Sequence, residues 1–364
     1  MRPRVWGVCM GFWLVVACAT PRPTPQTVER VWPLPPDPPR IAYVKSLEAP
    51  EVSLKPKGFF RKLFESLIGS GEAPPHLIRP FGMFVDSGGI LSVTDTGLQV
   101  VHRFNLNDGT YRQLFRLSGG RRLLSPTGVT EDREGMVYVA DSQLNRIEVF
   151  DATGRFQREL MSEGDAVRVA GIAYHSERDA VYVSDSGGHR ILLYGRDGRK
   201  LGSFGARGKE AGQFNFPTHL AVDSGGLLYV SDTMNFRVQV LNPDGTWVRS
   251  IGHLGQTLGS FSKPKGVGVD RHGNVYVVDG LYDTVQIFNP SGDLLLNFGN
   301  AGTVEGAFWL PTGVVVDGQD RIYVADTYNA RVQVFRLVDA SMPLDAQPRS
   351  TPIGSDGGVN TTGG

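Results

Sequence analysis

The residues best equipped for chemistry in this chain are an aspartate and an arginine that recur together. An Asp ends a short apolar run in each of six places, and in four of them an Arg follows five residues later. A carboxylate and a guanidinium at this spacing can form an ion pair that holds a loop together. Because the two charges recur side by side and cancel, we expect these pairs to be structural. The predicted structural pairs are Asp141 with Arg146, Asp185 with Arg190, Asp232 with Arg237, and Asp326 with Arg331.

Departures from the repeated pattern are better candidates for ligand contact. His219 stands where other units have Gly, near the start of a predicted strand, and His189 stands where others have Asn or Phe. With several loop residues they would form a shallow binding face containing exposed aromatic rings. The alternative for any one of these residues is neutral sequence variation at a solvent-exposed loop position, with no role in binding. The candidate binding face consists of His189, His219, Met234, Phe236, Tyr282, Asp283 and Tyr328.

The patterns that usually mark an active site are missing from the sequence. A zinc site needs three or four converging His, Cys or carboxylate ligands, and calcium needs acidic oxygens. The seven histidines are scattered, and the predicted inner strands begin with other residue types. No nucleophile elbow, phosphate loop or Cys–His pair is present. We therefore predict no catalytic residue, no metal and no cofactor. The inner-strand starts are Phe81, Thr127, Thr218, Lys265 and Thr312.

The elements that position these residues are the strands of a repeat. Each unit has a run such as Val275–Val278 before its Asp, with a Gly-containing turn before it and a third run and a hairpin turn after it. Periods of about 40 to 50 residues with several strands each are typical of propeller blades. Six copies predict an all-β, six-bladed β-propeller with four strands in each blade. The repeated Asp residues are Asp95, Asp141, Asp185, Asp232, Asp279 and Asp326.

The sixth unit lacks an outer strand. After Phe335 the chain soon enters a tail rich in Gly, Ser, Thr and Pro, whereas residues 40–47 read as a strand without a partner. We predict that this N-terminal strand completes the last blade, which closes the ring and removes an exposed sheet edge. The propeller is expected to span residues 40–338, and the flexible tail residues 339–364.

One segment interrupts the repeat. Apolar residues recur at helical spacing from Phe60 to Ile68, with basic residues on the other side, which predicts an amphipathic helix at about 57–69. Such a helix could contact a membrane or a partner. We favour packing against one end of the propeller channel, because a helix of about three turns is marginal on its own.

The N-terminus reads as an export signal. Two arginines precede the apolar run Val5–Ala17, which is shorter than the roughly 20 residues of a membrane-spanning helix. The end of this run, Val15-Val-Ala-Cys18, resembles the lipobox of bacterial lipoproteins. That resemblance implies removal of residues 1–17 and acylation of Cys18, whose acyl chains would insert into the membrane. Ala19 resembles the sorting signal for the outer membrane. An ordinary secreted protein is the alternative.

Composition fits an exported chain. Residues 18–39 are rich in proline and predict an extended tether. Both cysteines, Cys9 and Cys18, lie near the N-terminus, so the body of the protein has no disulfide framework. The 37 basic and 37 acidic residues balance, which argues against a nucleic-acid partner. We expect a lipid-anchored protein of the bacterial cell envelope, at the outer membrane.

Phrases in the last three units resemble the NHL repeat family. The segments Gly212–Pro217 and Gly306–Pro311 are similar to the phrase that precedes an NHL strand, and Asp232–Leu241 and Asp326–Phe335 are similar to its closing phrase. The resemblance covers roughly residues 76–338 and is weaker in units one and three. With its lipid signal, the chain resembles the six-bladed NHL lipoproteins of Gram-negative bacteria.

The resemblance to the NHL family also indicates which functions to consider. Related propellers include metal-dependent lyases and hydrolases, and some NHL domains bind RNA through a basic face. We expect a membrane-anchored, non-enzymatic binding scaffold whose loop face binds a protein, peptide or glycan. A metal-dependent lyase or hydrolase, using zinc or calcium at the channel mouth around His219, is the alternative.

Overall fold

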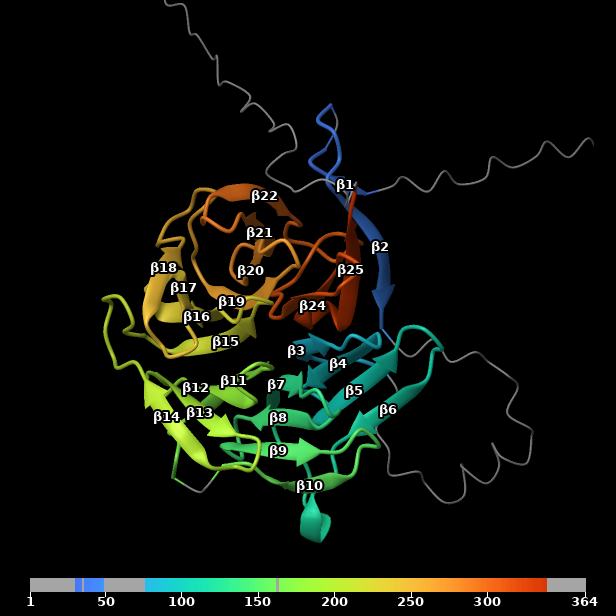
Figure 1. Ribbon diagram of the computed structural model, residues 1–364. Helices are drawn as coiled ribbons and strands as arrows, with labels where there is room; N and C mark the ends of the chain where they lie inside the picture. Colours follow the sequence, from blue (N-terminus) through green and yellow to red (C-terminus); the bar gives the residue numbers. More distant parts are fainter. Residues whose placement is uncertain (1–29, 35, 49–75, 162–163, 339–364) are drawn as a thin grey trace, which may run out of the picture.

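The molecule is a ring of six antiparallel β-sheets around a central axis (Figure 1). Cavities lined by the inner strands lie along this axis and form a central channel. The computed structural model describes residues 30–34, 36–48, 76–161 and 164–338. Each sheet is one blade, so the predicted all-β, six-bladed propeller is confirmed. Other predicted segments lie outside the described residues, namely the signal at 1–17, the lipidation site Cys18, the helix at about 57–69 and the tail at 339–364.

Five blades are four-stranded meanders whose strands follow chain order from the channel outwards. Blade one contains β3 (Pro80–Val85), β4 (Ile90–Asp95), β5 (Val100–Asn105) and β6 (Tyr111–Leu114). Blade two contains β7 (Pro126–Glu131), β8 (Val137–Asp141), β9 (Arg146–Phe150) and β10 (Phe156–Glu159). Blade three contains β11 (Val169–His175), β12 (Ala180–Asp185), β13 (Arg190–Gly195) and β14 (Lys200–Phe204). Blade four contains β15 (Pro217–Val222), β16 (Leu228–Asp232), β17 (Arg237–Leu241) and β18 (Trp247–Ile251). Blade five contains β19 (Pro264–Val269), β20 (Val275–Asp279), β21 (Thr284–Phe288) and β22 (Leu294–Phe298).

The sixth blade is completed by a strand from the other end of the chain, as predicted. Strand β2 pairs antiparallel with β25, with Ile41 opposite Leu337 and Leu47 opposite Val332. Ile41 is fully buried between blades five and six, so β2 adds side chains to the core as well as backbone pairing. The strands of blade six are β23 (Val314–Val316), β24 (Arg321–Asp326), β25 (Arg331–Leu337) and β2 (Ile41–Leu47).

A fifth strand, β1 (Val31–Trp32), extends blade six beyond β2. It falls inside the segment predicted to be a Pro-rich tether, so that prediction is corrected at these two residues. The indole of Trp32 packs against Phe298 and Phe335, with ring centroids 6.0 and 5.7 Å apart. This aromatic packing holds the short strand in place together with backbone hydrogen bonds from Arg40 to Trp32 and from Tyr43 to Arg30.

The hydrophobic core of the described residues is divided into six clusters, one between each pair of neighbouring blades. A tyrosine on the second strand recurs in these clusters, and in blades two, four, five and six its hydroxyl donates to the Asp of the preceding turn. In blade three, Tyr182 donates to the carbonyl of Pro243 instead. The hydroxyl of Tyr323 lies 3.0 Å from Asp317, and that of Tyr276 lies 3.1 Å from Asp270. A buried phenol needs such a partner, so this contact ties the turn to the blade.

The aspartates that end the second strands hold the start of the inner strands. Each of the six is fully buried. Their carboxylates accept hydrogen bonds from backbone N–H groups just before the inner strand of the same blade. The loops that follow these aspartates include the 3₁₀ turns η2 (Thr233–Asn235) and η3 (Thr327–Asn329). The third such turn, η1 (Ser118–Gly120), lies between β6 and β7.

Glycines let the inner strands approach one another closely. A Cβ atom built on Gly171 would lie 2.2 Å from the carbonyl oxygen of Thr218, and one on Gly313 would lie 2.4 Å from that of Phe81. Only glycine fits such contacts. Blade four departs from this rule with His219, which therefore projects from the inner wall of the channel.

Candidate functional site

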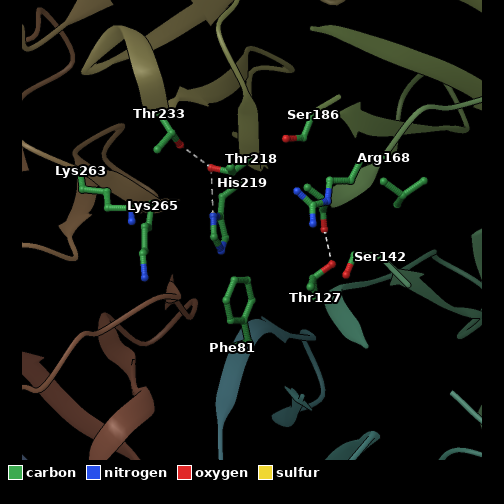
Figure 2. A pocket seen from close by; sticks show the side chains of 12 residues that line it. Phe81, Thr127, Ser142, Arg168, Ser186, Thr218, His219, Thr233, Lys263 and Lys265 are labelled. Carbon is green, nitrogen blue, oxygen red and sulfur yellow. Dashed lines mark hydrogen bonds between the residues drawn. The ribbon is translucent and has the colours of Figure 1, made fainter. Parts of the chain in front are cut away.

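A pocket of about 250 Å³ opens at the end of the channel where the inner strands begin, and we call this end the channel mouth. Lysines from blade five lie on one side of His219, and an arginine from blade three lies on the other (Figure 2). The aromatic, hydroxyl-bearing and cationic residues discussed below all line this pocket: Phe81, Thr127, Arg168, His219, Lys263 and Lys265.

The buried aspartates position two of the three cationic residues. The backbone N–H of Arg168 donates to Asp185 at 2.9 Å, and that of Lys263 donates to Asp279 at 3.1 Å. Lys265 is the second residue of β19 and belongs to the inner strand itself. The repeat thus fixes three backbone positions around the channel mouth, and the side chains at those positions decide the chemistry.

The pocket is positively charged. Within the described part of the chain, the side chains of Arg168, Lys263 and Lys265 make no hydrogen bond or ion pair, and no carboxylate lines the pocket. Burial, followed by the positive charge of Lys263, lowers the pKa of the Lys265 amine to about 8, although Asp283 acts in the opposite direction. Unpaired cations in a partly buried pocket attract an anion and gain strength from the reduced dielectric.

His219 forms the floor of the pocket as a neutral ring. It stacks on Phe81 with centroids 5.5 Å apart and an interplanar angle of 21°. Burial, followed by the positive charge of Lys265, lowers the pKa of His219 to about 3. The Nε2 atom is buried and has no hydrogen-bond partner in the described residues. His219 can therefore offer one polar atom to a ligand but does not add to the positive charge.

Hydroxyl groups complete the wall. Thr218 and Thr233 share a hydrogen bond of 2.7 Å, and Thr127 donates to the carbonyl of Ala170 at 2.7 Å (Figure 2). Thr233 also donates to the carbonyl of Pro264 at 2.9 Å, so these hydroxyl protons already have acceptors within the protein. What remains to each hydroxyl oxygen is the capacity to accept a hydrogen bond from a polar ligand.

A metal ion does not fit this pocket. No three His, Cys, Asp or Glu side chains converge anywhere in the described ranges. The side chains that interact with His219 are a threonine, a lysine and a phenylalanine. Two lysines and an arginine would repel a cation, so the donor set does not match the zinc or calcium site considered for His219.

The candidate binding face divides into two kinds of residue. Met234, Tyr282 and Tyr328 are exposed on the loops around the channel mouth, at 47%, 39% and 51%. Tyr328 packs beside Trp309, with ring centroids 5.7 Å apart, and Arg79 lies over its ring. Only His219 of the predicted set lines the pocket itself.

The other predicted face residues occupy left-handed turns between the second and third strands. His189 has φ +55° and its Nδ1 accepts from the N–H of Phe216 at 3.3 Å. Asp283 has φ +52° and accepts from the N–H of Leu310 at 2.6 Å. Phe236 has φ +57° and caps η2. His189 and Asp283 therefore join neighbouring blades, a structural task that their positions in the repeat did not reveal.

The Asp–Arg pairs are local ion pairs in three blades. The guanidinium Nε atoms of Arg190, Arg237 and Arg331 lie 3.0, 2.9 and 2.8 Å from the carboxylates of Asp185, Asp232 and Asp326. Blade two differs, because Arg146 forms its ion pair with Glu159 at 2.7 Å. Asp141 lies opposite Arg146 in the sheet register and accepts backbone N–H groups. The ion pair between Arg146 and Asp141 stays a prediction.

The cations of the pocket were missed as site residues. Lys265 was noted only as a residue that is not a carboxylate, and Arg168 and Lys263 were not singled out. All three flank the point where an inner strand begins, one position before it or one after. Comparing the residue types at this point across the six units would have revealed the cluster.

Comparisons with known proteins agree with the architecture. Two segments, residues 214–241 and 308–335, match the NHL repeat. Among solved structures, a virginiamycin B lyase from Staphylococcus aureus has 16% sequence identity and a TM-score of 0.53, and the match covers 71% of this chain and 95% of that one. A streptogramin B lyase has 12% identity and a TM-score of 0.54, with 72% and 94% covered.

A third similar structure is a protein of unknown function from Bacteroides thetaiotaomicron, with 17% identity, a TM-score of 0.55, and 73% and 71% of the two chains covered. Likeness at such low identity shows a shared fold only. The part of the chain that the structure describes has no helix with the length and apolarity to cross a membrane. The protein is a six-bladed β-propeller that carries NHL repeats in blades four and six.

Proposed function

We propose that this protein is a non-enzymatic binding scaffold that captures an acidic group of a protein, peptide or glycan at its channel mouth. The observation that carries the proposal is a set of three cations around one pocket, Arg168, Lys263 and Lys265, which have no ion-pair partner among the described residues. A carboxylate, phosphate or sulfate would neutralise them and regain the interactions lost on leaving water.

The surroundings of the pocket extend the contact surface. Met234, Tyr282 and Tyr328 are exposed on loops at the same end of the channel. Exposed aromatic side chains beside a charged pocket are typical of surfaces that bind a larger partner, because rings bury area at little entropic cost. The acidic group would enter the pocket, and the rest of the partner would lie over these loops.

The scaffold is proposed to act at the surface of a membrane. Acylation of Cys18 would anchor it to the bacterial cell envelope, at the outer membrane, and the Pro-rich segment would hold the propeller away from the lipid. The support for this part is the N-terminal sequence alone. We do not propose a metal-dependent lyase or hydrolase, because the pocket residues repel a cation.

Calorimetric titration of the purified chain with glycolate, citrate and a short polyglutamate peptide tests the proposal. We expect binding that weakens as salt is added, because the attraction is electrostatic. The double variant Arg168→Gln/Lys263→Gln should bind at least roughly tenfold more weakly, a loss of about 1.4 kcal/mol.

The matched control removes two cations outside the pocket, in the variant Arg199→Gln/Lys209→Gln. It changes the net charge equally and should keep the wild-type affinity. Equal losses in both double variants would mean that only net charge matters. That result, or no binding of any acid, would refute the proposed function.

A further inference from the structure

Lys265 is unusual among the residues at its position in the repeat. It is the second residue of an inner strand, and it is the one amine at that place in the six units. Its side chain borders the pocket and is only partly exposed, and Figure 2 shows it on the side of His219 opposite Arg168. The equivalent residues in the other blades are Phe81, Thr127, Ala170, Thr218 and Thr312.

The groups that face Lys265 favour the neutral amine. Lys263 repels a second positive charge, and His219 is neutral. Among the described residues, Asp283 of the β20–β21 loop is the carboxylate that favours the ammonium form, and its oxygen already accepts from the N–H of Leu310. With a pKa of about 8, roughly a tenth of this amine is unprotonated at pH 7, whereas an ordinary lysine has less than about a thousandth in that form. A lysine that is desolvated and lies next to another cation is a typical imine-forming nucleophile.

We propose that Nζ of Lys265 forms a reversible imine with a small carbonyl compound that also carries an acid group. The inference rests on the proposed function, since Arg168 and Lys263 would hold the acid group while the amine meets the carbonyl carbon. The nitrogen lone pair attacks that carbon and gives a carbinolamine. The two amine hydrogens then leave with the carbonyl oxygen as one molecule of water, and a carbon–nitrogen double bond remains. No oxidant or reductant is required.

Reductive trapping tests the inference. The full chain is incubated at pH 7 with glyoxylate and cyanoborohydride, which reduces an imine to a stable secondary amine, and the modified lysines are identified by peptide mass spectrometry. We expect Lys265 to be modified roughly tenfold faster than any exposed lysine, because more of its amine is neutral. The rate should rise with pH and level off above pH 8, and excess glycolate should slow it.

Two variants keep the test sharp. Lys265→Arg preserves the positive charge and removes the primary amine, so trapping at the channel mouth should disappear while the melting temperature stays near that of the wild type. Lys209→Arg changes an exposed lysine in the loop after β14 and should leave trapping at Lys265 unaltered. Modification spread evenly over the lysines, or unchanged in Lys265→Arg, would overturn the inference.

Glycolate, which has the acid group but no aldehyde or ketone, separates this inference from the proposed function. If glycolate binds the wild-type chain and glyoxylate gives no adduct at Lys265, the imine is refuted and anion binding stands. If glycolate does not bind either, the proposed function fails as well.

Discussion

At the scale of single residues, Glu148 is an acid in a position built for an amide. It lies on β9, fully buried, and neither carboxylate oxygen has a hydrogen-bond partner in the described structure. The equivalent Gln333 accepts from the N–H of Gly306 at 2.7 Å and donates to the carbonyl of Ala307 at 2.6 Å. Burial, followed by the charge of Glu159, raises the pKa of Glu148 to about 7.

The raised pKa predicts that Glu148→Gln stabilises the protein above neutral pH. Between its ordinary value of 4.5 and about 7, the unfolded chain releases the proton while the folded protein keeps it, so the free energy of unfolding falls as pH rises. Glutamine removes this penalty, and we expect a gain of roughly 2 kcal/mol at pH 8 and little change at pH 4.5. Urea denaturation at both pH values measures the difference.

An exposed acid gives the control for this prediction. Glu177→Gln, in the turn after β11, should leave the free energy of unfolding unchanged at both pH values. A gain from Glu148→Gln that is the same at pH 4.5 and pH 8 would show that packing, rather than ionisation, is responsible.

At the scale of elements, most strands were predictable and most contacts at the channel mouth were not. Each strand follows from local alternation and turn chemistry, and the need to close the ring placed residues 40–47 against β25. The pocket depends on residues in blades three, four and five that converge only when the ring is complete. Arg168 and Lys263 stand at a position with no fixed residue type, and β1 depends on the packing of Trp32 in a Pro-rich stretch.

Ring closure by β2 predicts that Ile41→Ala destabilises the whole propeller. Ile41 is fully buried among residues of blades five and six, and removing such a side chain costs about 3 kcal/mol. Val44, on the same strand, is 45% exposed, so Val44→Ala should cost little. Thermal unfolding followed by circular dichroism compares the two variants. A change in melting temperature that is equal for both would contradict a closing role for β2.

At the scale of the whole molecule, attachment to the membrane is separable from the propeller. The proposed lipid site, Cys18, precedes every described strand, so Cys18→Ser should leave the fold intact. We expect radiolabelled palmitate to enter the wild-type chain and not the variant, and the variant to leave the membrane fraction. A palmitate label that survives in Cys18→Ser would refute lipidation at this residue.

The pairing of β2 with β25 in blade six also makes ring closure the last step of folding during synthesis. Strand β2 emerges early and its partner β25 is the last strand to be made, whereas every other blade is complete once its own four strands exist. At about 5 to 20 residues per second, the wait for β25 is on the order of tens of seconds. During that time β2 has no strand to pair with on its inner side. A chain cut short before Arg331 can form the first five blades but lacks the strand that pairs with β2. Only the chain that includes β25 can therefore close the ring.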